Sequence, residues 1–106
     1  MNVLDVDDKN FEVEVTNSDK PVLIDFGATW CGPCRTLSPI VDSFAESQNE
    51  VKVVKIDIDD YPKLAALYKV RAVPTLVLIK NGAQVATNVG MISLSKLTDF
   101  VNNNLK

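Results

Sequence analysis

Strand-like runs and helical patterns alternate along the chain, and Asn81-Gly82 joins the last two strand-like runs. Asn-Gly favours the positive φ angles of a type I′ turn, so residues 75–87 predict a β-hairpin. Residues 21–26 and 51–58 are short apolar runs rich in strand-forming residues, which is typical of buried strands. One hairpin, together with strands separated by helices, predicts an α/β domain built on a mixed sheet.

The segment after Pro33 has the pattern of a helix with one buried face. Its apolar residues recur at spacings of three and four, the period of an amphipathic helix. They are Leu37, Ile40, Val41, Phe44 and Ala45. Pro39 lies inside this pattern and removes one backbone donor. Because the pattern continues beyond Pro39, we expect a kinked helix rather than two separate helices.

A second, shorter helix is expected near residues 62–68. Pro62 falls in its first turn, where the missing amide hydrogen costs nothing. Asp59 or Asp60 is the expected cap, because a carboxylate accepts hydrogen bonds from the free amides of the first turn.

The two ends of the chain give different signals. Residues 94–103 have a helical pattern, with Ser93 as the expected cap. The side chains expected to be buried there are Leu94, Leu97, Phe100 and Val101. Near the N-terminus, Phe11, Val13 and Val15 alternate with polar residues, which on pattern alone favours a strand.

Length and charge set limits on the kind of protein. The 106 residues are expected to form a single domain over residues 1–106. The net charge is −3 and there is no basic stripe, which argues against nucleic acid as a partner. No apolar stretch approaches the ~20 residues that a bilayer span needs. The first eight residues, MNVLDVDD, lack the features of a secretory signal, so we expect a cytoplasmic protein.

The chain has two cysteines and no histidine, and this count excludes several kinds of site. Structural zinc takes four Cys or His ligands, so a metal site would need a second chain or carboxylates, and we expect none. Cys–His proteases, Ser–His–Asp hydrolases and HExxH zinc proteases all need histidine. The four glycines match no phosphate-binding motif. The reactive chemistry that remains is that of thiols.

Both cysteines lie in the sequence Trp-Cys-Gly-Pro-Cys over residues 30–34. The pattern places Cys31 at the start of a helix, where free amides and the helix dipole favour thiolate over thiol. Cys34 follows one turn later and suits a resolving thiol. Gly32 allows a partner's backbone to approach closely, and Pro33 fixes φ at a helix start. We therefore expect Cys31 to be exposed and reactive, with Cys34 tucked behind it.

Asp25 interrupts an apolar strand and has two possible interpretations. If the strand is buried, desolvation raises the pKa of this carboxyl and makes it a proton acceptor near neutral pH. Alternatively, Asp25 lies at a frayed strand end in water. Lys55, in the neighbouring strand pattern, is either its countercharge or a solvated side chain.

Two more residues near the cysteines stay open on the sequence alone. Trp30, the sole tryptophan, is either part of the core or an apolar rim that contacts other proteins, and its place beside a reactive cysteine favours the rim. Pro74 opens a strand. Its peptide bond is either trans, as most are, or cis.

Residues 30–34, preceded by VLIDF and followed by SPI three residues later, closely resemble the thioredoxin family. The similarity extends to residues 55–62, to residues 68–82 and to the segment around Gly90, so it covers essentially the whole chain in order. The resemblance implies a thioredoxin fold with a central mixed β-sheet flanked by about four α-helices. It also implies that residues 8–16 form the first helix rather than a strand.

The resemblance implies roles for single residues as well. Cys31 resembles the attacking thiol and Cys34 the resolving thiol. Asp25 looks like the buried acid–base group, and Lys55 matches the lysine beside it. Pro74 is similar to the family's cis-proline, which faces the cysteine loop. The substrate-binding residues implied in this way are Trp30, Gly32, Pro33, Val73, Pro74, Gly90 and Met91, and the backbone of Val73 would bind an extended peptide.

The function that follows from the resemblance is a thiol–disulfide oxidoreductase, an electron carrier of cell redox homeostasis that reduces disulfides in target proteins. Such a protein has no bound cofactor beyond its redox-active Cys31–Cys34 disulfide. A thioredoxin reductase recycles it, so NADPH is used indirectly. We expect a monomer.

Two alternatives stay open. The same fold can act as an oxidant or isomerase, or the Cys-x-x-Cys surface can be a non-catalytic binding module in a larger enzyme.

Gly27 departs from the family pattern, because many members have a second tryptophan at this position. Its small size is expected to loosen packing beside the cysteine loop.

Overall fold

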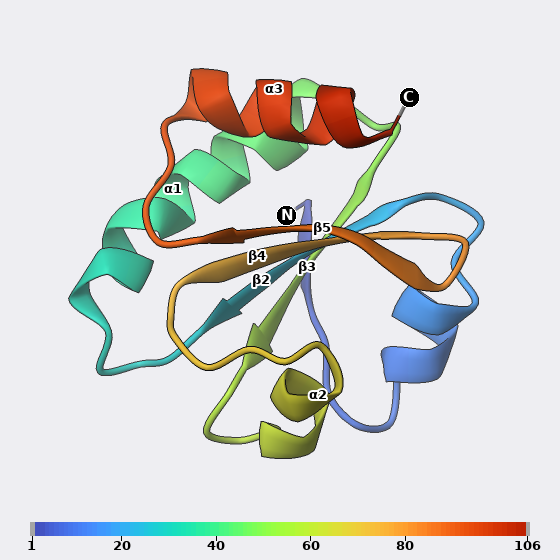
Figure 1. Cartoon of the computed structure of the whole chain (residues 1–106), viewed down its shortest axis with the longest axis vertical. Helices are drawn as coiled ribbons and strands as arrows, with labels where there is room; N and C mark the ends of the chain where they lie inside the picture. Colours follow the sequence, from blue (N-terminus) through green and yellow to red (C-terminus); the bar gives the residue numbers. More distant parts are fainter. Residues whose placement is uncertain (1, 106) are drawn as a thin grey trace.

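Five strands form one mixed sheet in the computed structural model, which describes residues 2–105 (Figure 1). The strands are β1 (Val3–Asp5), β2 (Val22–Gly27), β3 (Lys52–Asp57), β4 (Thr75–Lys80) and β5 (Ala83–Val89). Their order across the sheet is β1-β3-β2-β4-β5. β1, β3 and β2 run parallel, whereas β4 is antiparallel to both β2 and β5. β2 is therefore the central strand, with a neighbour on each edge.

Helices cover both faces of this sheet. They are η1 (Glu12–Thr16), α1 (Gly32–Ser47), α2 (Pro62–Leu67) and α3 (Leu94–Asn104). In Figure 1, α1 and α3 lie above the sheet, whereas α2 and the blue N-terminal helix lie below it. The expected thioredoxin fold, with a central mixed sheet and about four helices, is confirmed.

The alternation of side chains along β2 divides the core between the two layers. Val22, Ile24 and Phe26 join the cluster on the side of α2. Leu23 joins the cluster on the side of α1 and α3, which includes Leu37 and Leu97. Every residue of β2 is buried, as the apolar run in the sequence predicts.

Several local predictions are confirmed. Asn81 and Gly82 both have positive φ angles, of 54° and 78°, in the turn of the β4–β5 hairpin. α1 continues past Pro39, as its apolar pattern indicates. The Ser93 hydroxyl accepts a hydrogen bond from the backbone N–H of Lys96 at 3.2 Å, so Ser93 does cap α3.

Other local predictions are wrong. Neither Asp59 nor Asp60 caps α2: the N-cap residue is Tyr61, without a side-chain hydrogen bond. The backbone N–H groups of both aspartates instead donate to Asp57 Oδ1, at the end of β3. These hydrogen bonds hold the loop between β3 and α2. Leu94, expected to be buried, is 40% exposed because it occupies the first position of α3, at the edge of the buried face.

The N-terminal region differs in part from both sequence interpretations. Residues 8–10 form a turn, and the helix implied by the resemblance is the short η1. The alternating pattern of Phe11, Val13 and Val15 therefore does not make a strand. β1, which no pattern predicted, pairs with β3 over three residues only.

Candidate functional site

The alternation along β2 also brings a carboxyl group to the α1 side of the sheet. Leu23 faces α1, so Asp25 and Gly27, two and four residues later, face the same way. On β3, Lys55 is the register partner of Asp25. The end of β2 then leads through a short loop to the start of α1, which places both cysteines above this part of the sheet.

Cys31 is the N-cap residue of α1, and a disulfide joins it to Cys34 with 5.2 Å between the Cα atoms. The backbone N–H of Cys34 donates a hydrogen bond to Cys31 Sγ at 3.1 Å. Pro33 lies in the first turn, where no amide hydrogen is needed. The prediction that Cys31 lies at the start of a helix is therefore confirmed. At this end of α1, free amides and the helix dipole favour negative charge on its sulfur.

The expected difference in exposure between the cysteines is wrong. Cys31 is only 4% exposed, whereas Cys34 is half-buried. Gly27, which is buried, lies next to Cys34: a Cβ atom at this position would be 3.6 Å from Cys34 Sγ.

A pocket of about 610 Å³ opens on this inner side. Asp25, Gly27 and Cys34 line it together with Lys55 and residues from the outer face of α1. Cys34 and Asp25 therefore line the same pocket.

Asp25 is buried, with 4% of its surface exposed. Burial away from water raises the pKa of its carboxyl from 3.8 to about 6. The nearby Lys55 ammonium lowers this pKa and the Asp42 carboxylate raises it, both by smaller amounts. Among the described residues no ion pair joins Asp25 to Lys55, which is exposed, so the lysine acts through space.

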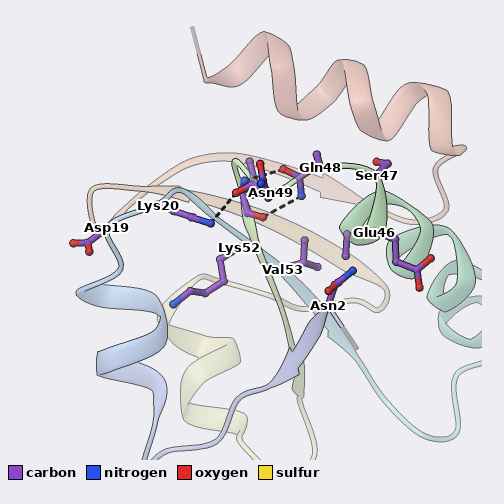
Figure 2. A pocket seen from close by; sticks show the side chains of 11 residues that line it. Asn2, Asp19, Lys20, Glu46, Ser47, Gln48, Asn49, Lys52 and Val53 are labelled. Atoms are coloured by element: carbon purple, nitrogen blue, oxygen red, sulfur yellow. Dashed lines mark hydrogen bonds between the residues drawn. The ribbon is translucent and has the colours of Figure 1, made fainter.

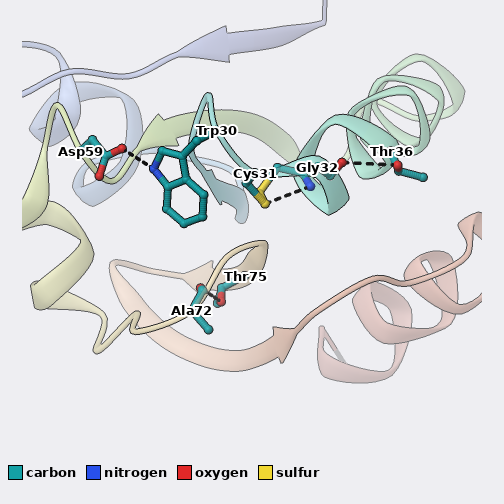
Figure 3. The surroundings of a disulfide bond; sticks show 8 residues. Trp30, Cys31, Gly32, Thr36, Asp59, Ala72 and Thr75 are labelled. Atoms are coloured by element: carbon teal, nitrogen blue, oxygen red, sulfur yellow. Dashed lines mark hydrogen bonds between the residues drawn. A yellow bond between two sulfur atoms is a disulfide. The ribbon is translucent and has the colours of Figure 1, made fainter.

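The outer side of the disulfide is apolar at its rim. Trp30 is 64% exposed, so it is not part of the core. Its Nε1–H donates a hydrogen bond to Asp59 Oδ2 at 2.7 Å, and this contact fixes the edge of the indole ring (Figure 3). Met91 is 46% exposed and adds further apolar surface.

The loop before β4 lies across from the disulfide, as Figure 3 shows for Ala72 and Thr75. The Val73–Pro74 peptide bond is cis, as the resemblance implied. The Thr75 hydroxyl donates to the Ala72 carbonyl at 2.6 Å, and the Gly90 N–H donates to the Pro74 carbonyl at 2.9 Å. These two bonds hold the proline loop and the Gly90 segment together.

Comparison with known proteins identifies the group to which this arrangement belongs. The thioredoxin family model matches residues 2–103. The chain is 48% identical to a thioredoxin of Porphyra purpurea over 103 residues, covering 96% of each chain. It is 46% identical to thioredoxins of Haemophilus influenzae, with 97% of each chain covered, and of Rickettsia bellii, with 94% of this chain and 96% of that one covered.

The chain belongs to the thioredoxin family. Its disulfide-linked Cys31 and Cys34 fit the reaction of that family, so it is a dithiol–disulfide oxidoreductase that reduces protein disulfides. The sequence-based recognition of the family and of the reaction is confirmed.

A second, larger pocket of about 720 Å³ lies where β2 and β3 begin and α1 ends, at the other end of the sheet from the thioredoxin disulfide. Figure 2 shows the side chains that line it. Polar groups around it bond to one another: Lys20 Nζ donates to the Asn49 carbonyl at 2.7 Å, and Gln48 Oε1 accepts from the Val51 N–H at 2.8 Å. These bonds close the loop between α1 and β3, and no cysteine lines this pocket.

Within residues 2–105, no cluster of three or more His, Cys, Asp or Glu side chains could hold a metal ion. Over the same range, no helix is both long enough and apolar enough to cross a membrane.

Sequence reasoning missed three residues around the thioredoxin disulfide. Asp59 holds the indole of Trp30, and Arg35 and Asp42 line the pocket behind Cys34. A signal for the last two was present: Arg35, Ser38 and Asp42 recur at spacings of three and four, and so share one face of α1. The sequence held no such signal for Asp59, because this residue is 29 positions away from Trp30 along the chain.

Proposed function

We propose that Cys31 is the attacking thiol in the reduction of target disulfides. Its thiolate forms a bond to one target sulfur, and the other target sulfur leaves with the electron pair. Cys34 then attacks Cys31 Sγ, which releases the reduced target and forms the Cys31–Cys34 disulfide. The position of Cys31 as helix N-cap, with the Cys34 N–H on its sulfur, is the observation that carries this proposal.

Asp25 takes the proton of Cys34 in the second step. A general base works best when its pKa lies near the working pH, and burial raises that of Asp25 to about 6. Both groups line one pocket, so proton transfer directly or through water is open to them. The ammonium of Lys55, which is exposed on β3, lowers the pKa of Asp25.

Target chains bind as extended peptides on the outer side of the disulfide. Trp30 and Met91 provide exposed apolar surface there, and Gly32 and Pro33 leave the approach to Cys31 clear of bulky side chains. Among the hydrogen bonds of residues 2–105, none uses the backbone N–H or C=O of Val73. These two groups are therefore available to a peptide laid beside cis-Pro74, and Gly90 completes the rim.

The oxidised protein is recycled by a thioredoxin reductase, a flavoprotein that takes its electrons from NADPH. This protein itself needs no bound cofactor, since two cysteines carry both electrons. We further propose that it acts as a single-domain monomer in the cytoplasm.

An insulin assay tests the reaction and the partner in turn. With dithiothreitol as electron source, the wild type speeds the precipitation of reduced insulin, whereas Cys31→Ser has no activity above background. NADPH with a bacterial thioredoxin reductase then replaces dithiothreitol. Activity of Cys31→Ser in the first assay overturns the assignment of the attacking thiol, and loss of wild-type activity in the second overturns the partner.

A docking role is the competing proposal, and the exposed Trp30 and Met91 favour it. The double variant Cys31→Ser, Cys34→Ser keeps this surface but loses both thiols. If the double variant restores a thioredoxin-deleted strain as well as the wild type does, docking rather than electron transfer is the biological role.

A further inference from the structure

A groove lies between α1 and the beginning of α3. In Figure 1, the segment that links β5 to α3 passes beside α1, and this segment forms one wall of the groove. The volume of the groove is about 700 Å³, and neither cysteine lines it. The residues that line it, which together we call the α1–α3 groove, are Ile40, Asn88, Met91, Ile92, Ser93 and Lys96.

The groove continues the surface that we propose for target peptides. Met91 is 46% exposed and belongs to both. The N–H of its neighbour Gly90 donates to the Pro74 carbonyl at 2.9 Å, and the Gly90 carbonyl accepts a hydrogen bond from Asn88 Nδ2 at 3.4 Å. Asn88 in turn lines the groove. These hydrogen bonds connect one wall of the groove to the proline loop that faces the disulfide.

The other wall is a face of α1 that begins beside the disulfide. Pro33, Leu37 and Ile40 recur at spacings of four and three, so they lie on one face of the helix. Ile40 is half-buried and lines the groove. From Pro33 to Ile40 the helix rises about 10 Å, which an extended peptide covers in about three residues. A target segment that follows this face therefore reaches the groove about three residues from its own cysteine.

The charge of the groove is opposite in sign to that of the whole protein. Among the described residues that line the groove, Lys96 alone is charged. Lys96 is exposed, and no ion pair that includes it is found within residues 2–105. It lies in the first turn of α3, which contains no acidic residue. A cation in this position favours a carboxylate on the partner.

The rest of the groove offers apolar contacts. Ile40 and Ile92 are both half-buried, so part of each side chain is covered and part is open to a partner. Met91 is unbranched and can adapt its shape to different neighbours. A leucine-sized side chain placed against these three residues would be removed from water, which favours its binding.

We propose that the α1–α3 groove selects protein targets that carry a large apolar side chain, with a carboxylate next to it, about three residues from the reacting cysteine. This inference rests on the proposed function, because the groove contacts a target while Cys31 attacks it. The long-range effect of charge has the opposite sign, since the net charge of −3 attracts cationic targets. A preference for acidic targets is therefore a specific mark of the groove.

Peptide disulfides test this selection with the reduced wild type. Each peptide has one cysteine, bonded to thionitrobenzoate, and a leucine three positions away between two glutamates. Companion peptides have lysines in place of the glutamates or serine in place of the leucine, and each peptide is made in both chain directions. Cys31 thiolate bonds to the peptide sulfur, and coloured thionitrobenzoate leaves with the electron pair. Rates with dithiothreitol give the intrinsic reactivity of each peptide and are divided out.

The expected result is a preference in one chain direction. At low salt the glutamate peptide should react about tenfold faster than the lysine peptide, and this ratio should fall as salt rises. The leucine peptide should react about tenfold faster than the serine peptide. Equal corrected rates in both directions, or faster reaction of the lysine peptides, overturn the proposal.

Two lysine variants test the cation. Lys96→Glu is expected to reverse the preference, so that the lysine peptide reacts faster than the glutamate peptide. Lys63→Glu is the matched control, because it changes the net charge equally but lies on α2, on the opposite face of the sheet. This control should keep the preference for glutamate. A preference that survives in Lys96→Glu, or that both variants lose equally, overturns the role of Lys96.

A trapped complex locates the peptide without any change in the groove. Cys34→Ser cannot resolve the mixed disulfide, so the peptide stays bonded to Cys31 Sγ. In NMR spectra, the amide signals of Ile92 and Lys96 are expected to shift more with the leucine peptide than with the serine peptide, whereas that of Lys63 should not move. Shifts confined to Trp30 and the loop before β4 overturn the proposal.

A second copy of the chain is the alternative occupant of the groove. Sedimentation equilibrium at the concentrations of the assay is expected to show a monomer. A dimer that Ile40→Ser converts to monomers would make the groove an interface between copies, and so overturns the selection of peptides.

These outcomes are separate from those of the insulin assay. An insulin-active wild type that reacts equally with all the peptides retains the proposed function but not the selection by the groove. If Cys31→Ser releases thionitrobenzoate at the wild-type rate, the attacking thiol is wrong and both proposals fail.

Discussion

The two sides of the disulfide differ in almost every physical property. The outer side carries the exposed Trp30 and Met91 and faces the cis-Pro74 loop. The inner side is a pocket with a buried carboxyl group and charged residues from two strands and α1. The peptide-binding surface and the proton-transfer site that we propose are thus separated by a single pair of sulfur atoms. Substitutions on the two sides should therefore change different measurable quantities.

The largest expected difference is in stability. Because burial holds the pKa of Asp25 at about 6 instead of 3.8, its ionisation opposes folding. The penalty is absent below pH 3.8, grows between pH 3.8 and 6 and is complete above that, where it amounts to roughly 3 kcal/mol. Asp25→Ala should therefore raise the free energy of unfolding at pH 7 by up to this amount, with no electrostatic gain at pH 3.5.

Urea unfolding at both pH values measures this effect. Asp59→Ala is the control from the outer side, since it removes an exposed carboxylate that holds the Trp30 ring, and it should give no gain at pH 7. Asp25→Ala less stable than the wild type at pH 7 contradicts a buried, ionised carboxyl.

The second effect is on one step of the reaction. Asp25→Asn removes the base but keeps the shape of the side chain, so attack by Cys34 on the mixed disulfide should slow about 100-fold at pH 7. Formation of the mixed disulfide by Cys31 should change little. Stopped-flow measurements with a chromogenic disulfide separate the two steps. A wild-type rate for the second step means that another group takes the proton of Cys34.

A smaller effect is expected from the outer side. Trp30→Ala removes exposed apolar surface that we assign to peptide binding, so kcat/KM for insulin should fall about tenfold, mainly through KM. Reduction of small disulfides should stay close to the wild-type rate. Leu67→Ala, on α2, is a control of similar exposure. Equal losses with insulin and with small disulfides place Trp30 in the chemistry rather than in binding.

The smallest effect tests the through-space action of Lys55. Its ammonium lowers the pKa of Asp25, so Lys55→Met should move that pKa above 6. The shift is measured by NMR of the Asp25 carboxyl carbon, and it should shrink at high salt because Lys55 is exposed. Lys63→Met, on α2, should leave the titration of Asp25 unchanged. An unmoved pKa in Lys55→Met removes the lysine from the proton-transfer site.

Local chemistry explains which parts of the molecule the sequence predicts well. The turn at Asn81-Gly82, the cap at Ser93 and the place of Cys31 before α1 each depend on residues within one turn of each other. The strand β2 was also recognisable from its apolar run, because every residue of this strand is buried.

The features that sequence reasoning missed depend on distant partners. Cys34 lies against Gly27, on another element, and the indole of Trp30 bonds to Asp59, 29 positions away in the sequence. β1 has three residues, mostly exposed, so it carries no hydrophobic pattern of its own and exists through its pairing with β3. Patterns along the chain do not contain this information.

The central place of β2 has a consequence for motion. Its amides bond to strands on both edges, so deuterium from solvent can replace their hydrogens only when the whole sheet comes apart. The first turn of α1 has less protection, because the amides of Cys34 and Arg35 bond to the adjacent Cys31 and not to a neighbouring strand. Exchange at the sulfurs therefore does not require the strand that carries Asp25 to open.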